Sequence, residues 1–129
     1  MDDELKFRPL WLVVGWCLVA AIVYLSVGHA SVAPNVENGD KIGHFLAYGA
    51  LSLWFFQLFR RPPQRFGACF GLLALGVGLE CVQYLLPYRS FDTMDMLANA
   101  CGVAFGWIAA PPRLPNLLAW FERAMRAPA

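Results

Sequence analysis

The chain has 129 residues, of which 59% are hydrophobic and only 15% are charged, and its formal net charge is +1. A soluble domain of this length needs a charged surface, and this composition supplies too little charge to build one. A net charge near zero also argues against nucleic acid as a partner. The mean hydropathy of +0.51 instead indicates a membrane protein.

Four apolar segments are long enough to cross a bilayer, which needs about 20 helical residues. They cover residues 9–28, 41–59, 66–86 and 94–110. The connections are short, and Arg60-Arg61-Pro62-Pro63-Gln64-Arg65 is assigned to the second of them. The sequence therefore predicts an all-α fold, an integral membrane four-helix bundle in which residues 1–129 form a single domain.

The first segment shares some features with a cleaved signal peptide. Lys6 and Arg8 precede it, and Ser31-Val32-Ala33 loosely resembles a cleavage site. However, its apolar run from Leu10 to Val27 is longer than the roughly 7–15 residues of a signal core. We expect a retained transmembrane helix.

Residues 115–126, after the fourth span, have an amphipathic pattern that begins at Pro115. One face holds the apolar residues Leu114, Leu117, Leu118, Phe121 and Met125. The polar residues Asn116, Glu122, Arg123 and Arg126 lie largely opposite. This pattern predicts an interfacial helix on the anionic cytoplasmic leaflet.

The basic residues are unevenly distributed between the two sides of the predicted membrane. Eight lie on one side: Lys6, Arg8, Arg60, Arg61, Arg65, Arg113, Arg123 and Arg126. Only Lys41 and Arg89 lie on the other. By the positive-inside rule, we expect both termini to be cytoplasmic.

Three polar blocks interrupt the apolar segments, and all three fall on the predicted extracytoplasmic side. They cover residues 40–48, 80–83 and 89–99. Ionisable groups are costly to place in hydrocarbon, so such residues are candidates for function. Helical spacing places Lys41, His44 and Tyr48 on one face of the second span. The antiparallel spans therefore predict one shared polar pocket at the outer leaflet.

We expect ten residues to form this site. The candidate ligand-binding residues are Asp40, Lys41, Tyr48, Gln83, Arg89, Asp92 and Asn99, and the candidate catalytic residues are His44, Glu80 and Asp95. Structural roles are also open: Asp40 and Asp92 stand where helix N-caps belong. Glu80 can form an ion pair with Lys41 or Arg89. The others can make interhelical hydrogen bonds, namely His44, Tyr48, Gln83 and Asn99.

Small residues recur along two of the spans. The fourth span has Ala98, Gly102, Gly106 and Ala110, and the third has Gly67-xxx-Gly71 and Ala74-xxx-Gly78. Such faces let membrane helices pack closely. They favour packing within the bundle, and homo-oligomerisation remains the alternative.

The three blocks together resemble the signature of the VanZ-like family. The motifs read Asp40-Lys41-x-x-His44-Phe45-x-x-Tyr48, Glu80-x-x-Gln83-x-x-x-Pro87-x-Arg89 and Asp92-x-x-Asp95-x-x-x-Asn99-x-x-Gly102. Members are small bacterial inner-membrane proteins named for a teicoplanin-resistance protein. The resemblance implies an inner-membrane location and a cell-envelope role linked to glycopeptide susceptibility. It does not supply a reaction.

Two classes of function fit these residues. In the first, the pocket recognises the head group of an envelope lipid or lipid-linked cell-wall precursor, with Arg89 and Lys41 holding phosphate. In the second, Glu80, His44 and Asp95 act as acid, base and orienting group in a hydrolase or transferase. A histidine and carboxylates can hold a divalent metal, but no HExxH-like spacing is present, and we expect no cofactor. Proton-coupled transport or a structural subunit role is a further alternative.

Overall fold

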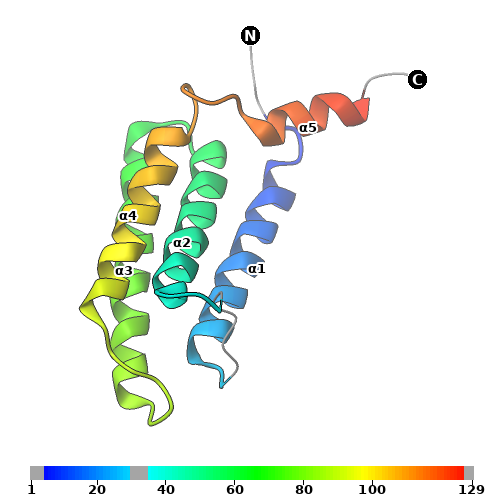
Figure 1. The fold of residues 1–129 in the computed structure, drawn as a ribbon. Coiled ribbons are helices and arrows are strands. Elements are labelled where there is room, and N and C mark those ends of the chain that lie inside the picture. The colour runs from blue at the N-terminus through cyan, green and yellow to red at the C-terminus, as the bar shows by residue number, and fades with distance from the viewer. Residues whose placement is uncertain (1–4, 30–34, 127–129) are drawn as a thin grey trace.

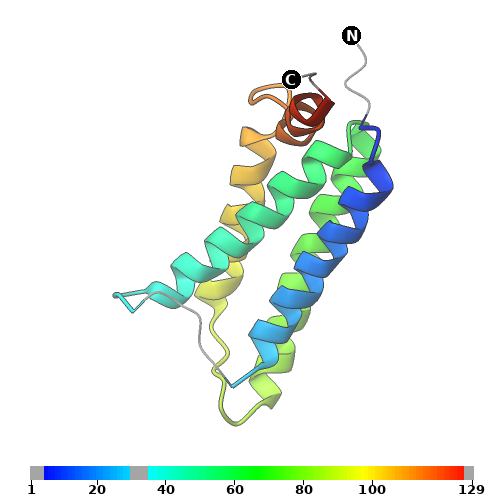
Figure 2. The same ribbon diagram turned by 90° about the vertical axis from the view of Figure 1, so that its right-hand side faces the viewer.

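The computed structural model describes residues 5–29 and 35–126, which form five helices and no strands. The helices are α1 (Arg8–Val27), α2 (Gly39–Leu58), α3 (Pro62–Leu85), α4 (Thr93–Ala109) and α5 (Leu117–Arg126). The all-α prediction is confirmed. Helices α1 to α4 lie alongside one another in alternating directions (Figures 1 and 2), and α5 lies across the end at which α1 begins.

Helix α3 begins four residues earlier than predicted, because Pro62 to Arg65 form its first turn rather than a connection. Proline is well suited to this position, since the first helical N–H groups have no partner within the helix. Arg65 then donates to the carbonyls of Phe59 at 2.8 Å and Phe56 at 3.0 Å. The side chain therefore ties the start of α3 to the end of α2.

Two helices, α1 and α3, are long and apolar enough to cross a membrane. Helix α4 has only 17 residues, and α2 carries Asp40, Lys41 and His44 in its first two turns. Two of the four predicted spans therefore meet the length and hydropathy criteria.

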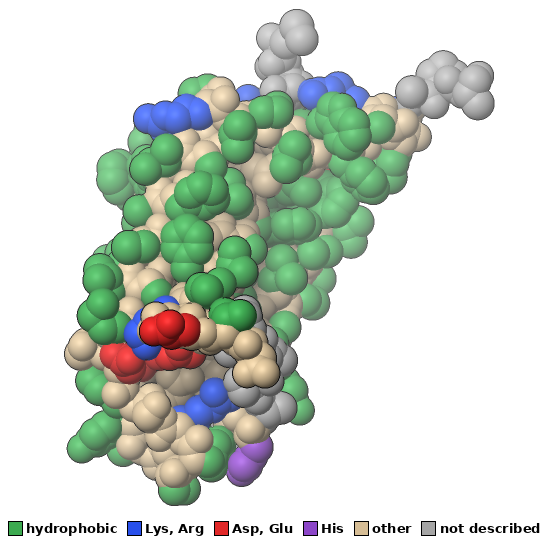
Figure 3. All heavy atoms as spheres, viewed as in Figure 1, with side chains coloured by type: hydrophobic (Ala, Val, Ile, Leu, Met, Phe, Trp, Pro, Cys, Tyr) green, Lys and Arg blue, Asp and Glu red, His purple; other side chains and the backbone are tan. Residues whose placement is uncertain are grey.

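The outer surface of the bundle is strongly apolar. Trp16 on α1, Phe70 on α3 and Leu97 on α4 are 65%, 76% and 54% exposed. Figure 3 shows hydrophobic side chains over most of the visible face, between basic groups at one end and an acidic group toward the other. Soluble monomers rarely expose apolar surface on this scale, so the surface suits a lipid environment.

Helix α2 is the central helix and contacts α1, α3 and α4. Its most extensive contact is with α4, where Gly49 faces Gly102. A Cβ atom at Gly102 would lie 2.5 Å from the carbonyl oxygen of Phe45. The glycines of α4 are therefore required for this close approach, which confirms the prediction of internal packing on that helix.

The small residues of α3 behave differently. A Cβ atom at Gly67, Gly71 or Gly78 would meet no atom within 4 Å. This face is open in the single chain, so internal packing does not account for the motif there.

Helix α1 is packed into the bundle. Gly15 lies against Trp54 and Phe55 of α2, and the rings of Trp11 and Trp54 meet edge to face at 6.0 Å. These contacts do not distinguish a retained helix from a cleaved one, so its retention stays a prediction. The cleavage-like Ser31-Val32-Ala33 lies outside the described residues.

Glu122 of α5 was predicted on the polar face, and this prediction was wrong. Glu122 lies one turn after Leu118 on the face that packs against the bundle, and it is only 2% exposed. Its carboxylate accepts from the backbone N–H groups of Lys6 at 2.8 Å and Phe7 at 3.0 Å, and from Trp11 Nε1 at 2.7 Å. Helix α5 is thus fixed to the start of α1.

Other apolar residues of α5 are largely exposed, although the ring of Phe121 also meets Trp11 of α1 edge to face at 5.9 Å. Leu117, Phe121 and Met125 are 58%, 45% and 55% exposed. A helix that lies across the bundle with such a face outward has the form expected of an interfacial helix.

Candidate functional site

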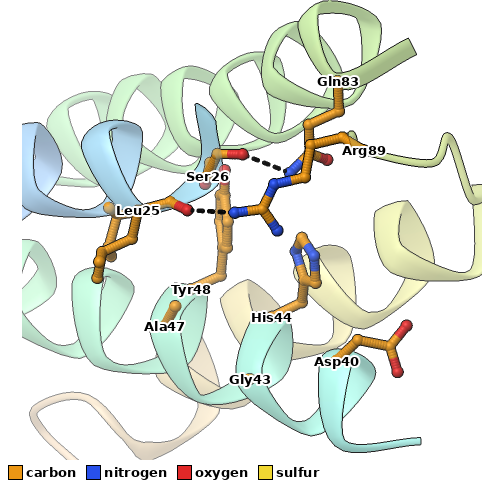
Figure 4. Close-up of a pocket in the computed structure, with 10 residues that line it drawn as sticks. Leu25, Ser26, Asp40, Gly43, His44, Ala47, Tyr48, Gln83 and Arg89 are labelled. Atoms are coloured by element: carbon orange, nitrogen blue, oxygen red, sulfur yellow. Dashed lines mark hydrogen bonds between the residues drawn. The ribbon is translucent and has the colours of Figure 1, made fainter. Parts of the chain in front are cut away.

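The three polar blocks meet at the end of the bundle opposite α5 (Figure 1). A pocket of about 150 Å³ lies between the start of α2 and the ends of α1 and α3. Five of the ten predicted residues line it: Asp40, His44, Tyr48, Gln83 and Arg89 (Figure 4). The other five contact this group from α2, α3, α4 and the loop before α4.

Lys41 is surrounded by three carboxylates. Its Nζ lies 2.9 Å from Asp40 Oδ2, 2.8 Å from Asp92 Oδ2 and 3.4 Å from Asp95 Oδ1. The hydrogen bond from this ammonium group holds the pKa of Asp92 below its usual value. Lys41 is one of the two basic residues on the side of the predicted membrane that has few of them. Its position is explained by acidic partners from its own helix, from α4 and from the loop before α4.

The two proposed helix caps have different outcomes. Asp92 caps α4, because its side chain accepts a hydrogen bond from the N–H of Met94 at 2.8 Å. Asp40 does not cap α2, since the helix begins at Gly39 and Asn38 holds the cap position. Asp40 instead lies in the first turn, where a negative charge interacts favourably with the helix dipole.

His44 is at the centre of the site. Its Nδ1 lies 2.9 Å from Asn99 Oδ1, and its Nε2 lies 3.5 Å from Asp95 Oδ2 and 3.9 Å from Glu80 Oε1. An amide oxygen only accepts hydrogen bonds, so His44 Nδ1 carries the proton in the contact with Asn99. This arrangement directs Nε2 toward the two carboxylates.

Glu80 is the most deeply buried acid of the site. Its side chain is 1% exposed, and Oε1 has no hydrogen-bond partner among the described residues. Oε2 accepts one long hydrogen bond, 3.4 Å, from the N–H of Asp92. A buried carboxylate with so few partners is unusual, because desolvation penalises an ionised group that is not compensated.

Glycine makes room for the amide of the site. A Cβ atom at Gly76 of α3 would lie 2.9 Å from Asn99 Nδ2 and 3.4 Å from Tyr48. Tyr48 is 2% exposed, and its hydroxyl group has no hydrogen-bond partner among the described residues. The Tyr48 hydroxyl group lies in the pocket wall, and together with Glu80 Oε1 it makes two buried polar atoms of the site without a partner among the described residues.

Gln83 and Arg89 bind the end of α1 (Figure 4). Gln83 Nε2 donates to the carbonyl of Ser26 at 2.9 Å. Arg89 donates through Nη2 to the carbonyls of Leu25 at 2.8 Å and Gly28 at 2.6 Å, and through Nε to Gly28 at 3.1 Å. Both side chains therefore satisfy carbonyls at a helix C-terminus, and their ligand-binding roles remain predictions.

The sequence pattern missed the contribution of α1 to this pocket. Ile22, Leu25 and Ser26 line it, although the first span contains none of the polar blocks. Only the pairing of helices in space brings these residues to the site.

The charges of the site are unbalanced. Its four carboxylates exceed its two permanent cations, Lys41 and Arg89, by two formal charges when His44 is neutral. The arrangement can exchange protons between an imidazole and carboxylates, or it can hold a cation. An anion alone would enter an environment of like charge.

Comparisons with known proteins place the chain in a family. The model of the family described as VanZ/LLP1 matches residues 7–118. An uncharacterized protein of Schizosaccharomyces pombe is 35% identical over 105 residues, which are 79% of this chain and 64% of the relative. The chain thus spans less than two-thirds of that protein's length.

No solved structure matches the chain significantly. The family match covers most of the chain, including all of α1 to α4 and the first two residues of α5. The resemblance seen in the three polar blocks is confirmed, and the chain belongs to the VanZ/LLP1 family.

Proposed function

We propose that this protein is a multi-pass membrane protein whose pocket recognises the polar head group of a membrane lipid. The observation that carries the proposal is a pocket at one end of an apolar bundle, to which five polar side chains contribute, namely Asp40, His44, Tyr48, Gln83 and Arg89. In a bacterial cell we place the protein in the inner membrane, with both termini cytoplasmic and the pocket facing the periplasm.

The four-span arrangement is supported by the exposed apolar surface. Helix α4 is short and helix α2 is polar at its start, but they pack alongside two helices that are long and apolar enough to cross a membrane. Of the polar residues that shorten the apolar length of α2, Asp40 and His44 line the pocket, and Lys41 pairs with the neighbouring carboxylates. Helix α5 then lies in the cytoplasmic interface, with Leu117 and Phe121 toward lipid.

The size of the pocket favours a small head group. Sites for drug-sized molecules are about 300–1,000 Å³, whereas this pocket is about 150 Å³. It accommodates a phosphate and a short substituent, but not the sugar and peptide of a whole cell-wall precursor. A link to glycopeptide susceptibility would then be an indirect effect on the envelope.

A membrane-embedded hydrolase or transferase is the second candidate. It is favoured by the convergence of His44, Glu80 and Asp95 from three helices. In this case the buried Glu80 is the general acid and His44 the base, oriented by Asn99. Turnover of lipid phosphates by the purified protein, lost in His44→Ala, would support it over binding alone. Proton transport has less support, because the pocket lies at one end of the bundle.

Native mass spectrometry of protein extracted with its own lipids tests the proposal. Ala47 lines the pocket, so Ala47→Trp should fill it and displace the bound lipid. The matched control is Ala50→Trp on the same helix, where the side chain is exposed. We expect one phospholipid class to co-purify with the wild type and the control, and at least tenfold less with Ala47→Trp.

An unchanged lipid profile in Ala47→Trp would contradict the proposal, as would a wild-type profile that only mirrors the bulk membrane. Circular dichroism and gel filtration in detergent establish that both variants fold. Crosslinking in the same membranes would show whether the chain forms a homo-oligomer, which we propose for the open glycine face of α3.

A further inference from the structure

Three helices each direct one metal-binding side chain to the same point. His44 of α2, Glu80 of α3 and Asp95 of α4 each have one ligand atom within 4.8 Å of the others. The Glu80 and Asp95 side chains are only 1% and 9% exposed. Such a group is shielded from water on most sides, unlike an ordinary acidic surface.

We propose that these three side chains bind one divalent transition-metal ion, through His44 Nε2 and one carboxylate oxygen each of Glu80 and Asp95. Two ligands that are each about 2.1 Å from a tetrahedral ion lie about 3.4 Å apart. The separations from His44 Nε2 are 3.5 Å to Asp95 Oδ2 and 3.9 Å to Glu80 Oε1. Small side-chain rotations bring all three atoms to coordination distance.

The unpartnered oxygen of Glu80 is the first independent support for a cation. Oε1 is buried, has no hydrogen-bond partner among the described residues, and is the atom that faces His44. A buried ligand oxygen in this position is satisfied by an ion that it coordinates. A purely structural carboxylate would need donors instead, as Glu122 has.

The orientation of His44 is the second support. Its Nδ1–H donates to Asn99 Oδ1 at 2.9 Å, which fixes the ring and places the Nε2 lone pair toward the carboxylates. Metal-bound histidines commonly donate their other N–H to an oxygen in this way. Gly76 allows the approach of Asn99, so the supporting residue is itself held by the packing of α3.

The net charge of the site and the partners of the Asp95 oxygens are both consistent with one bound divalent ion. A divalent cation neutralises the formal excess of two negative charges at the site. Lys41 occupies the neighbouring acidic group, where it contacts Oδ1 of Asp95 at 3.4 Å, and Oδ2 remains directed to His44. The Asp95 carboxylate can thus contact the Lys41 ammonium group through Oδ1 and the proposed metal ion through Oδ2.

The ligand set selects the class of metal. Ca²⁺ and Mg²⁺ prefer oxygen ligands alone, whereas an imidazole with carboxylates suits Zn²⁺, Mn²⁺ or Fe²⁺. Three protein ligands leave a coordination position for water or another oxygen. An oxygen of a lipid phosphate could occupy this open position, and that role rests on the proposed function. Binding of the ion itself does not rest on it.

The experiment uses the full chain in detergent, purified without a histidine tag and stripped with a chelator. It is dialysed against micromolar ZnCl₂ or MnCl₂, and metal is measured by plasma mass spectrometry and titration calorimetry. We expect about one ion per chain in the wild type. Glu80→Gln, Asp95→Asn and His44→Ala should each weaken the affinity by at least about tenfold.

Glu122→Gln is the matched control, because it neutralises an equally buried carboxylate at the other end of the bundle. All variants keep Cys17, Cys69, Cys81 and Cys101, so cysteine-bound zinc would be the same in each. Circular dichroism identifies any variant that fails to fold, and the metal affinities of the remaining folded variants then test the site. No bound ion in the wild type, or equal binding in folded Glu80→Gln, would overturn the site. Neither result requires lipid, so the lipid proposal is judged separately.

Discussion

Glu80 and Glu122 are both almost completely buried, but their surroundings differ. Glu122 accepts hydrogen bonds from two backbone N–H groups and Trp11, and it pairs with Arg126 at 2.5 Å. Its burial is explained by these partners alone. Glu80 has one long hydrogen bond and an oxygen without a donor. The same residue type is therefore structural at one end of the bundle and a candidate for function at the other.

Removing the Glu122 carboxylate should destabilise the protein. Glu122→Ala leaves the N–H groups of Lys6 and Phe7 and the indole of Trp11 without their acceptor. An unsatisfied buried donor costs about 1–3 kcal/mol, so we expect a loss of at least about 2 kcal/mol in the free energy of unfolding. Unfolding in detergent by urea measures it. Arg126→Ala, which removes only a half-exposed partner, should cost below about 1 kcal/mol; equal effects would contradict this interpretation.

The same carboxylate should make stability depend on pH. Burial raises the pKa of Glu122, but the hydrogen bonds from Trp11, Phe7 and Lys6 and the charge of Arg126 outweigh it and lower the pKa. The ionised form therefore stabilises the fold above pH 4.5, the usual pKa of the group, and this contribution is lost as pH falls below that value. Between pH 7 and pH 3, the stability difference between the wild type and Glu122→Gln should shrink. A constant difference would exclude this linkage.

At the scale of helices, the glycines of α4 and α3 should respond in opposite ways to the same substitution. Gly102→Ala places a Cβ 2.5 Å from a backbone oxygen of α2, and such overpacking costs about 1–3 kcal/mol. Gly71→Ala meets nothing within 4 Å and should gain up to about 1 kcal/mol from helix propensity. Thermal unfolding of both variants compares them. Destabilisation by Gly71→Ala would mean that another molecule covers that face.

The order and type of the helices could be predicted from sequence, because hydrophobic segments of membrane length are a strong one-dimensional pattern. The grouping of the three polar blocks could also be predicted, since alternating direction and helical spacing together decide which ends meet. The start of α3 was missed because Pro62 and Pro63 resemble a connection as much as a first turn.

Contacts between distant segments could not be predicted in this way. Glu122 and Lys6 are 116 residues apart, and Arg89 and Leu25 are 64 apart. Periodicity places a residue on a face, but it does not say which other element that face meets. For that reason the sequence does not predict that α1 lines the pocket. The three proposed cation ligands, His44, Glu80 and Asp95, come from three different helices, so they do not form a metal-binding motif in the sequence.

At the scale of the whole molecule, the two ends of the bundle differ in charge. Most basic residues lie at the end that carries α5, whereas the acidic cluster lies at the pocket end (Figure 3). An apolar surface separates them. If the protein spans a bilayer as proposed, the positive-inside rule predicts that its arginine-rich end lies in the cytoplasm. The pocket would then face the opposite side.

Cysteine labelling tests this orientation. Ser90, beside the pocket, and Gln64, in the first turn of α3 at the basic end, are both exposed. Each is changed to cysteine in a chain whose own cysteines are alanine: Cys17, Cys69, Cys81 and Cys101. In sealed right-side-out vesicles, a membrane-impermeant maleimide should label Ser90→Cys and should reach Gln64→Cys only after detergent is added. The reverse pattern would invert the topology and turn the pocket toward the cytoplasm. Labelling of both sites before detergent would mean that the chain does not span the membrane, and the exposed surface of α1 and α3 would then need another partner.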